Sequence, residues 1–169
     1  MNSRLQKGHT LVELLIYTTL LVAVSFAVVA SIITTQNYLR QTKEYDDLRR
    51  SGLVSLERIT RLIQNASSVD AGASTFNTHP GKLVLAVPNV GAGTDIFEIS
   101  TSSARITLRK NGGANEDLTG KKISVSNLLF RNITTTKGSA VRVEITLTAT
   151  SPIMRSETFT TTAVLRGSY

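Results

Sequence analysis

The residues that could support chemistry lie at the start of the chain. Glu13 stands beside an apolar run of 20 residues without a formal charge, from Leu14 to Ile33. A carboxylate that enters the centre of a membrane costs on the order of 2.5–3.5 kcal/mol. In low dielectric, a cationic amine within reach relieves that cost by pairing with the carboxylate. Glu13 is therefore the first candidate for a functional residue.

Motifs for catalysis or metal binding are not found in the sequence. There is no G-x-x-x-x-G-K-[ST] phosphate loop and no H-E-x-x-H pair, and a chain with two His and no Cys has few ligands for zinc. Asn111 to Asp117 carries oxygen ligands for Ca²⁺ but lacks the alternating acidic spacing of a calcium loop, which favours a hairpin turn. His79, beside Pro80, is interpreted as a solvated loop residue. We expect no catalytic residue, no cofactor and no metal, and thus a protein that is not an enzyme.

The apolar run admits three interpretations. As a helix it is about 30 Å long, the thickness of the hydrocarbon core of a bilayer. A secretory signal peptide would have a shorter apolar core followed by a small-residue cleavage site, and Ala27 to Ser31 matches such a site only weakly. A plain membrane anchor fits the length but gives no reason for Glu13. The third interpretation rests on the residues before the run.

Gly8-His9-Thr10-Leu11-Val12-Glu13-Leu14 resembles the prepilin signature of type IV pilins and type II secretion pseudopilins, commonly G-F-T-L-x-E. The resemblance implies that a membrane-embedded prepilin peptidase cuts between Gly8 and His9 and methylates His9. It also implies that Glu13 pairs with the terminal amine of a neighbouring subunit during assembly. His9 departs from the usual Phe, so we expect processing that is retained but slower.

The expected organisation is a leader peptide over 1–8, a transmembrane helix segment over 9–36, its amphipathic continuation over 37–66 and a β-rich globular domain over 67–169. One long helix is predicted from about Leu11 to Ala66. Its second half carries apolar residues at Tyr45, Leu48, Leu56, Ile59, Ile63 and Ala66, and the last four have the spacing of a helical stripe that packs on a core. The family shows the same lollipop shape. Many pilins have a proline at the position of Ala30, and its absence favours a straighter helix and a minor subunit.

From Lys82 onward the pattern is that of β-strands. After a loop over 67–81, the expected strands are 83–87, 95–100, 104–110, 121–130, 140–150 and 156–166. Alternation turns Ile106 and Leu108 inward and Thr107 outward. Asn111-Gly112 predicts a type I′ turn. The predicted fold is α+β, with an antiparallel sheet laid on the helix.

Three further segments resemble minor subunits of the same families. Leu56 to Ala66 at the helix end, and the segments 128–132 and 159–166 in the last strands, are similar to minor pilins and J-type minor pseudopilins. The resemblance implies sibling pilin or pseudopilin subunits and prepilin peptidase as partners, with the lipid bilayer as the surroundings before assembly.

The formal net charge is +7, and +5 from side chains would remain after removal of the leader. Residues 71–169 carry eleven Lys and Arg against six Asp and Glu. A basic domain attracts anionic partners such as nucleic acid, but the positive charges are scattered and aromatics for base stacking are few. A solvated basic surface is the favoured interpretation, and nucleic-acid binding the alternative.

The sequence thus predicts a minor pilin or pseudopilin of a type II secretion pseudopilus or a type IV pilus. Two other classes stay open: a DNA-uptake minor pilin and a single-span anchored protein that does not assemble. Basic residues flank the apolar run on both sides, so their count does not orient it. The resemblance implies a cytoplasmic N-terminus in the inner membrane, with the C-terminal domain on the periplasmic or extracellular side.

Overall fold

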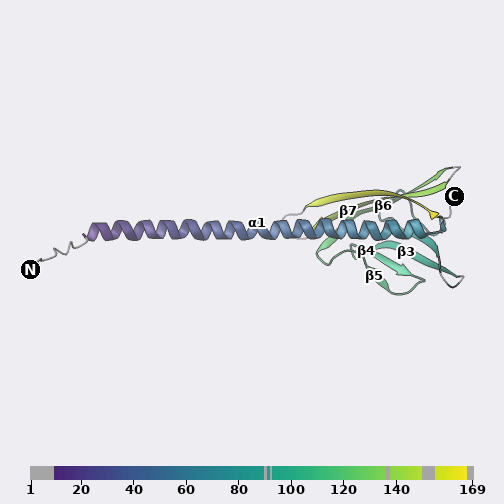
Figure 1. Ribbon diagram of the computed structural model, residues 1–169, viewed down its shortest axis with the longest axis horizontal. Coiled ribbons are helices and arrows are strands. Elements are labelled where there is room, and N and C mark those ends of the chain that lie inside the picture. Colours follow the sequence, from purple (N-terminus) through teal and green to yellow (C-terminus); the bar gives the residue numbers. More distant parts are fainter. Residues whose placement is uncertain (1–9, 90, 92, 136–137, 150–154, 167–169) are drawn as a thin grey trace, which may run out of the picture. The chain divides into compact units, whose positions relative to one another are not determined.

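The computed structural model describes residues 10–89, 91, 93–135, 138–149 and 155–166. Within them the fold is α+β, as predicted: one helix of 55 residues packs on antiparallel β-sheets (Figure 1). The elements in chain order are α1 (Leu11–Asn65), β1 (Ser68–Val69), β2 (Leu83–Pro88), β3 (Thr94–Ser102), β4 (Arg105–Lys110), β5 (Asn115–Asp117), β6 (Ile123–Thr135), β7 (Gly138–Ala149) and β8 (Ser156–Val164).

The chain divides between Thr42 and Lys43 into two units, each of which is described by itself. Among the described residues, the first unit contains Thr10 and the first part of α1, and its large apolar side chains are exposed from Leu11 to Leu39. The second unit contains the rest of α1 and all the strands. Its core consists of one face of the helix and the inner faces of the sheets.

The helix enters the core of the second unit through a stripe of small and apolar residues. Leu48, Ile59, Ile63 and Ala66 are fully buried, and the last three of them are positions of the predicted stripe. Leu56 is only partly buried. Between them, Gly52 and Ser55 also face the core, and neither was predicted to do so. The helix ends where the chain joins the first sheet, because Ser67 N donates to Ala86 O (2.8 Å) and Ser68 pairs with Ala86.

The strands form two antiparallel sheets, not the single sheet that was expected. The first has the order β1-β2-β3-β4-β5 and the second the order β6-β7-β8. The segment 77–81 explains the separation, because it covers the outer edge of β6 where another strand would pair. Asn77 N donates to Phe130 O, and Gly81 N donates to Leu128 O, both at 2.9 Å. A Cβ at Gly81 would lie 2.8 Å from Leu128 O, so this close approach requires glycine.

His79 takes part in this contact and is exposed, as expected for a solvated loop residue. Its Nδ1 accepts a hydrogen bond from Leu128 N at 3.0 Å. The imidazole thus replaces a backbone acceptor along the edge of β6. It has a structural role in joining the loop to the second sheet.

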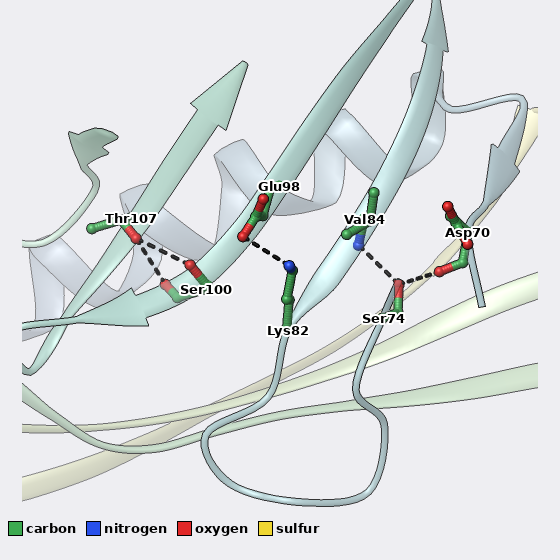
Figure 2. Close-up of polar contacts among 7 residues, drawn as sticks. All are labelled: Asp70, Ser74, Lys82, Val84, Glu98, Ser100 and Thr107. Atoms are coloured by element: carbon green, nitrogen blue, oxygen red, sulfur yellow. Dashed lines mark hydrogen bonds and ion pairs between the residues drawn. The ribbon is translucent and has the colours of Figure 1, made fainter. Parts of the chain in front are cut away.

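Side-chain bonds hold the first sheet and the loop beside it together (Figure 2). Ser74 Oγ donates to Asp70 O (2.6 Å) and accepts from Val84 N (2.9 Å), and Lys82 pairs with Glu98 at 3.0 Å. Thr107 was predicted to face outward but is buried. Its hydroxyl donates to Ser100 O at 3.3 Å, so the polar group is satisfied within the sheet.

The predicted type I′ turn is confirmed at Asn111-Gly112. Both residues have positive φ, 50° and 71°, and Gly113 N donates to Lys110 O at 2.9 Å. The Asn111 side chain also joins the turn to β3, where its Oδ1 accepts from Ile96 N (2.7 Å) and its Nδ2 donates to Asp95 (2.7 Å). The segment Asn115–Asp117, beyond the turn, is a short strand that was not predicted.

Asp95 makes folding of the second unit sensitive to acid. Hydrogen bonds from Lys110 and Asn111 hold the pKa of its carboxyl below the ordinary value of 3.8. A carboxyl whose pKa is lowered by folding stabilises the fold above its unfolded pKa, and this stabilisation is lost as the pH falls through the lower, folded value. We therefore expect the unfolding temperature of an Asp95→Asn variant to fall less steeply below pH 4 than that of the parent chain.

The measurement is thermal unfolding of the full chain in a non-ionic detergent, followed by circular dichroism from pH 6 to pH 2. Asp46→Asn is the matched control, because Asp46 is exposed and has no hydrogen bond or ion pair in the described part of the chain. Identical acid profiles for the parent chain and the Asp95 variant would contradict the prediction.

Candidate functional site

The candidate site lies at the first turn of α1. Gly8 and His9, the predicted cleavage and methylation residues, lie outside the described residues. Glu13, the predicted assembly residue, is the third residue of the helix. It is partly buried, whereas Leu11, Val12 and Leu14 beside it are exposed.

Thr10 caps the N-terminus of the helix. Its hydroxyl accepts a hydrogen bond from Glu13 N at 3.3 Å, and its carbonyl accepts the first helical bond, from Leu14 N, at 3.2 Å. A Thr followed three residues later by Glu is the sequence signature of a capping box. The signal was therefore present in Thr10-Leu11-Val12-Glu13, but the interpretation of the sequence did not use it. A negative charge near the N-terminus of a helix also interacts favourably with the helix dipole, which stabilises the helix.

Tyr17 lies one turn after Glu13 and was likewise not predicted as part of the site. Its hydroxyl donates a hydrogen bond to Glu13 Oε1 at 3.2 Å. Residues four apart lie on the same face of a helix, so the spacing alone permits this contact. The phenol supplies one donor to a carboxylate whose neighbours in sequence, Val12 and Leu14, are apolar and exposed.

Threonines of the helix that carries Glu13 bond to carbonyl groups of the helix itself. Thr18 and Thr19 donate to Leu15 O, both at 3.0 Å, and Thr34 donates to Ala30 O at 2.9 Å. Hydroxyls that bond to the carbonyl three or four residues earlier need no water, which is the condition for placing them in hydrocarbon. By length and composition, α1 fits a single membrane span or a signal sequence near the N-terminus.

The chemistry available at this site is recognition of a cation by a carboxylate. Glu13 presents negative charge at the start of an exposed apolar helix, with one oxygen held by Tyr17. A protonated amine placed beside it would make a charge-assisted hydrogen bond, which is stronger where the dielectric is low. Among the described residues, no group of three or more His, Asp or Glu side chains is arranged to hold a metal ion.

The architecture is consistent with a pilin-like fold, because an N-terminal apolar helix continues into a segment that packs on C-terminal antiparallel sheets. Comparison of the chain with protein-family models, with curated proteins and with solved structures finds no match. The functional assignment therefore depends on the residues of the site and on the fold.

Proposed function

We propose that the protein is a minor pilin or pseudopilin subunit. Prepilin peptidase would cut after Gly8 and methylate His9. Glu13 would then guide the subunit into a type II secretion pseudopilus or a type IV pilus as a tip or initiation subunit. The observation that carries the proposal is Glu13 at the capped start of a long, exposed apolar helix. That placement suits a carboxylate that selects a cationic amine while apolar helices pack around it.

Assembly is the mechanism in this proposal, and no catalytic step is required. Before assembly, the apolar half of the helix is held in the cytoplasmic membrane, with the C-terminal domain on the periplasmic or extracellular side. Pairing of Glu13 with the terminal amine of a sibling subunit sets the axial position of the incoming helix. The β-rich domain then determines which neighbour fits. A DNA-uptake minor pilin and an anchored protein that does not assemble are the alternatives.

The deciding experiment is the intact mass and N-terminal sequence of the protein extracted from membranes of cells that carry its native assembly machinery. We expect a chain that begins at methylated His9. A chain that still begins at Met1 would contradict maturation by prepilin peptidase and leave an ordinary anchor. A chain that begins beyond Ala30 would identify a cleaved signal peptide.

A further inference from the structure

Strand β8, the yellow arrow in Figure 1, forms an edge of the second sheet. Ala149 N donates to Arg155 O, and Leu165 N donates to Ser139 O, both at 3.0 Å. In an antiparallel pair, residues whose backbone N–H and C=O groups point toward the partner strand alternate with residues whose groups point away. These two bonds therefore show that the odd-numbered residues of β8 direct their backbone groups toward β7. The even-numbered residues direct their backbone N–H and C=O groups away from β7. These residues, all exposed, are Ser156, Thr158, Thr160, Thr162 and Val164, and we call them the open edge.

From Thr158 onward the open edge lacks the features that usually protect an edge strand, and the one charged residue of β8 is the partly buried Glu157. From Thr158 to Val164 there is no charge and no proline, and the pairing with β7 has no bulge. Natural sheets usually block such edges because unpaired backbone groups accept another strand. On the opposite edge of the same sheet, the segment 77–81 occupies the backbone groups of Leu128 and Phe130 on β6. No described residue hydrogen-bonds to the backbone of the open edge.

Two arginines lie across the sheet in line with this edge. Arg131 pairs directly with Arg142, and Arg142 pairs with Thr162 on the open edge. All three side chains are exposed on one face, and we call them the arginine row. Like charges directly opposite each other destabilise a sheet. Neither arginine has an ion pair or hydrogen bond in the described part of the chain.

The rows on either side of the arginine row restrict which partner fits. On one side lie Ile133 and Val164, which are 41% and 43% exposed. On the other side lies Glu144, paired with Thr160 on the open edge. A carboxylate added beside Thr160 would meet the like charge of Glu144, whereas one added beside Thr162 would meet the guanidinium of Arg142. The sheet therefore discriminates between positions two residues apart.

We propose that the open edge binds an extended segment of another polypeptide, which continues the sheet as a fourth strand and places a carboxylate opposite Thr162. Backbone hydrogen bonds supply affinity in this mode of recognition, and side chains supply specificity. Strands lie about 4.8 Å apart, so the added residue is about 10 Å from the backbone of Arg142, a span that arginine and glutamate side chains bridge together. A nucleic-acid strand would match the arginines but has no backbone ladder for the open edge. The inference depends only on the described sheet and goes beyond the proposed function.

The probe is a labelled ten-residue peptide that alternates threonine and valine and carries one glutamate at a threonine position. Binding to the full chain in a non-ionic detergent is measured by fluorescence anisotropy. We expect the glutamate peptide to bind about ten-fold more tightly than the same peptide with glutamine, equivalent to about 1.4 kcal/mol. Two further peptides test the backbone hydrogen bonds between the peptide and the open edge. Each is N-methylated on one of the two sets of alternate residues. We expect only the peptide whose methyl groups replace the N–H groups that point toward β8 to lose binding.

Three variants of the protein separate the two parts of the site. Arg142→Gln should remove the preference for glutamate over glutamine, whereas Lys122→Gln, an equal change of charge at another exposed residue, should retain it. Thr160→Pro should fold, because the N–H of Thr160 points away from β7. It should lower the affinity for the glutamate and glutamine peptides at least about ten-fold. If this variant fails to fold, the N-methylated peptides test the same hydrogen bonds from the side of the partner.

Several results would overturn the inference. Equal binding of the glutamate and glutamine peptides by the parent chain would remove the role of the arginine row. Undiminished binding by a folded Thr160→Pro variant, or by both N-methylated peptides, would remove the role of the open edge. A ten-nucleotide single strand of deoxythymidine is the competing ligand. If it displaces the labelled peptide at a lower concentration than unlabelled peptide does, the arginine row binds nucleic acid instead.

Discussion

A Gly52→Ala variant is expected to be less stable than the parent chain, although alanine is the better helix former. A Cβ at Gly52 would lie 2.8 Å from Cδ2 of Phe159 and closer still to Cε2 and Cζ of the same ring. Replacing glycine inside a helix by alanine ordinarily gains about 1 kcal/mol. Overpacking of a tight core costs about 1–3 kcal/mol. Because the ring is itself mostly buried and has little room to withdraw, we expect the clash to outweigh the gain.

The measurement is thermal unfolding of the full chain in detergent, followed by circular dichroism. A loss of 1 kcal/mol corresponds to about 2–4 °C for a chain of this size. Gly120→Ala is the control, because its nearest atom would be Ile123 Cδ1 at 3.8 Å, an ordinary contact. In a double-mutant cycle, Phe159→Leu should relieve the loss caused by alanine at position 52. An unfolding temperature above that of the parent chain for Gly52→Ala alone would show that the ring yields.

Replacing Glu13 is expected to leave cleavage after Gly8 intact and to reduce incorporation into the fibre. Under the proposed function, loss of the carboxylate leaves the terminal amine of the neighbouring subunit unpaired in an apolar bundle, which is costly. We expect at least a ten-fold lower fraction of Glu13→Ala than of the parent chain in sheared fibres, equivalent to about 1.4 kcal/mol or more.

Two variants separate the charge of Glu13 from its hydrogen bond with Tyr17. Glu13→Gln retains a polar side chain at the capped turn but not the negative charge, and Tyr17→Phe retains the charge but not the 3.2 Å hydrogen bond. We expect Glu13→Gln to be defective and Tyr17→Phe to assemble. The fraction of each variant in fibres is compared with that in membranes by quantitative immunoblotting, with N-terminal sequencing to verify cleavage. Normal incorporation of Glu13→Gln would exclude the role that we assign to the charge.

The sequence was sufficient for the features that depend on neighbouring residues. The helix was predicted to end at about Ala66 and ends at Asn65, because no Pro and only one Gly interrupts its periodic pattern. The turn at Asn111-Gly112 was predicted because Asn and Gly adopt positive φ at a lower cost than other residues, whereas Ser103-Ala104, which also has positive φ at both residues, carries no such signal. The signature around Glu13 was likewise readable in a single short segment.

Features that join distant segments were decided only by the tertiary structure. Alternation of apolar and polar residues shows which face of a strand is buried, but it does not show which strand lies beside it. The separation into two sheets follows from the segment 77–81 against β6, across almost 50 residues of sequence. For the same reason, the sequence alone indicates only that Gly52 lowers the stability of the helix, whereas the structure shows that the Phe159 ring packs against it. The alignment of Arg131, Arg142 and Thr162 is likewise set by the register between strands, because each residue comes from a different strand.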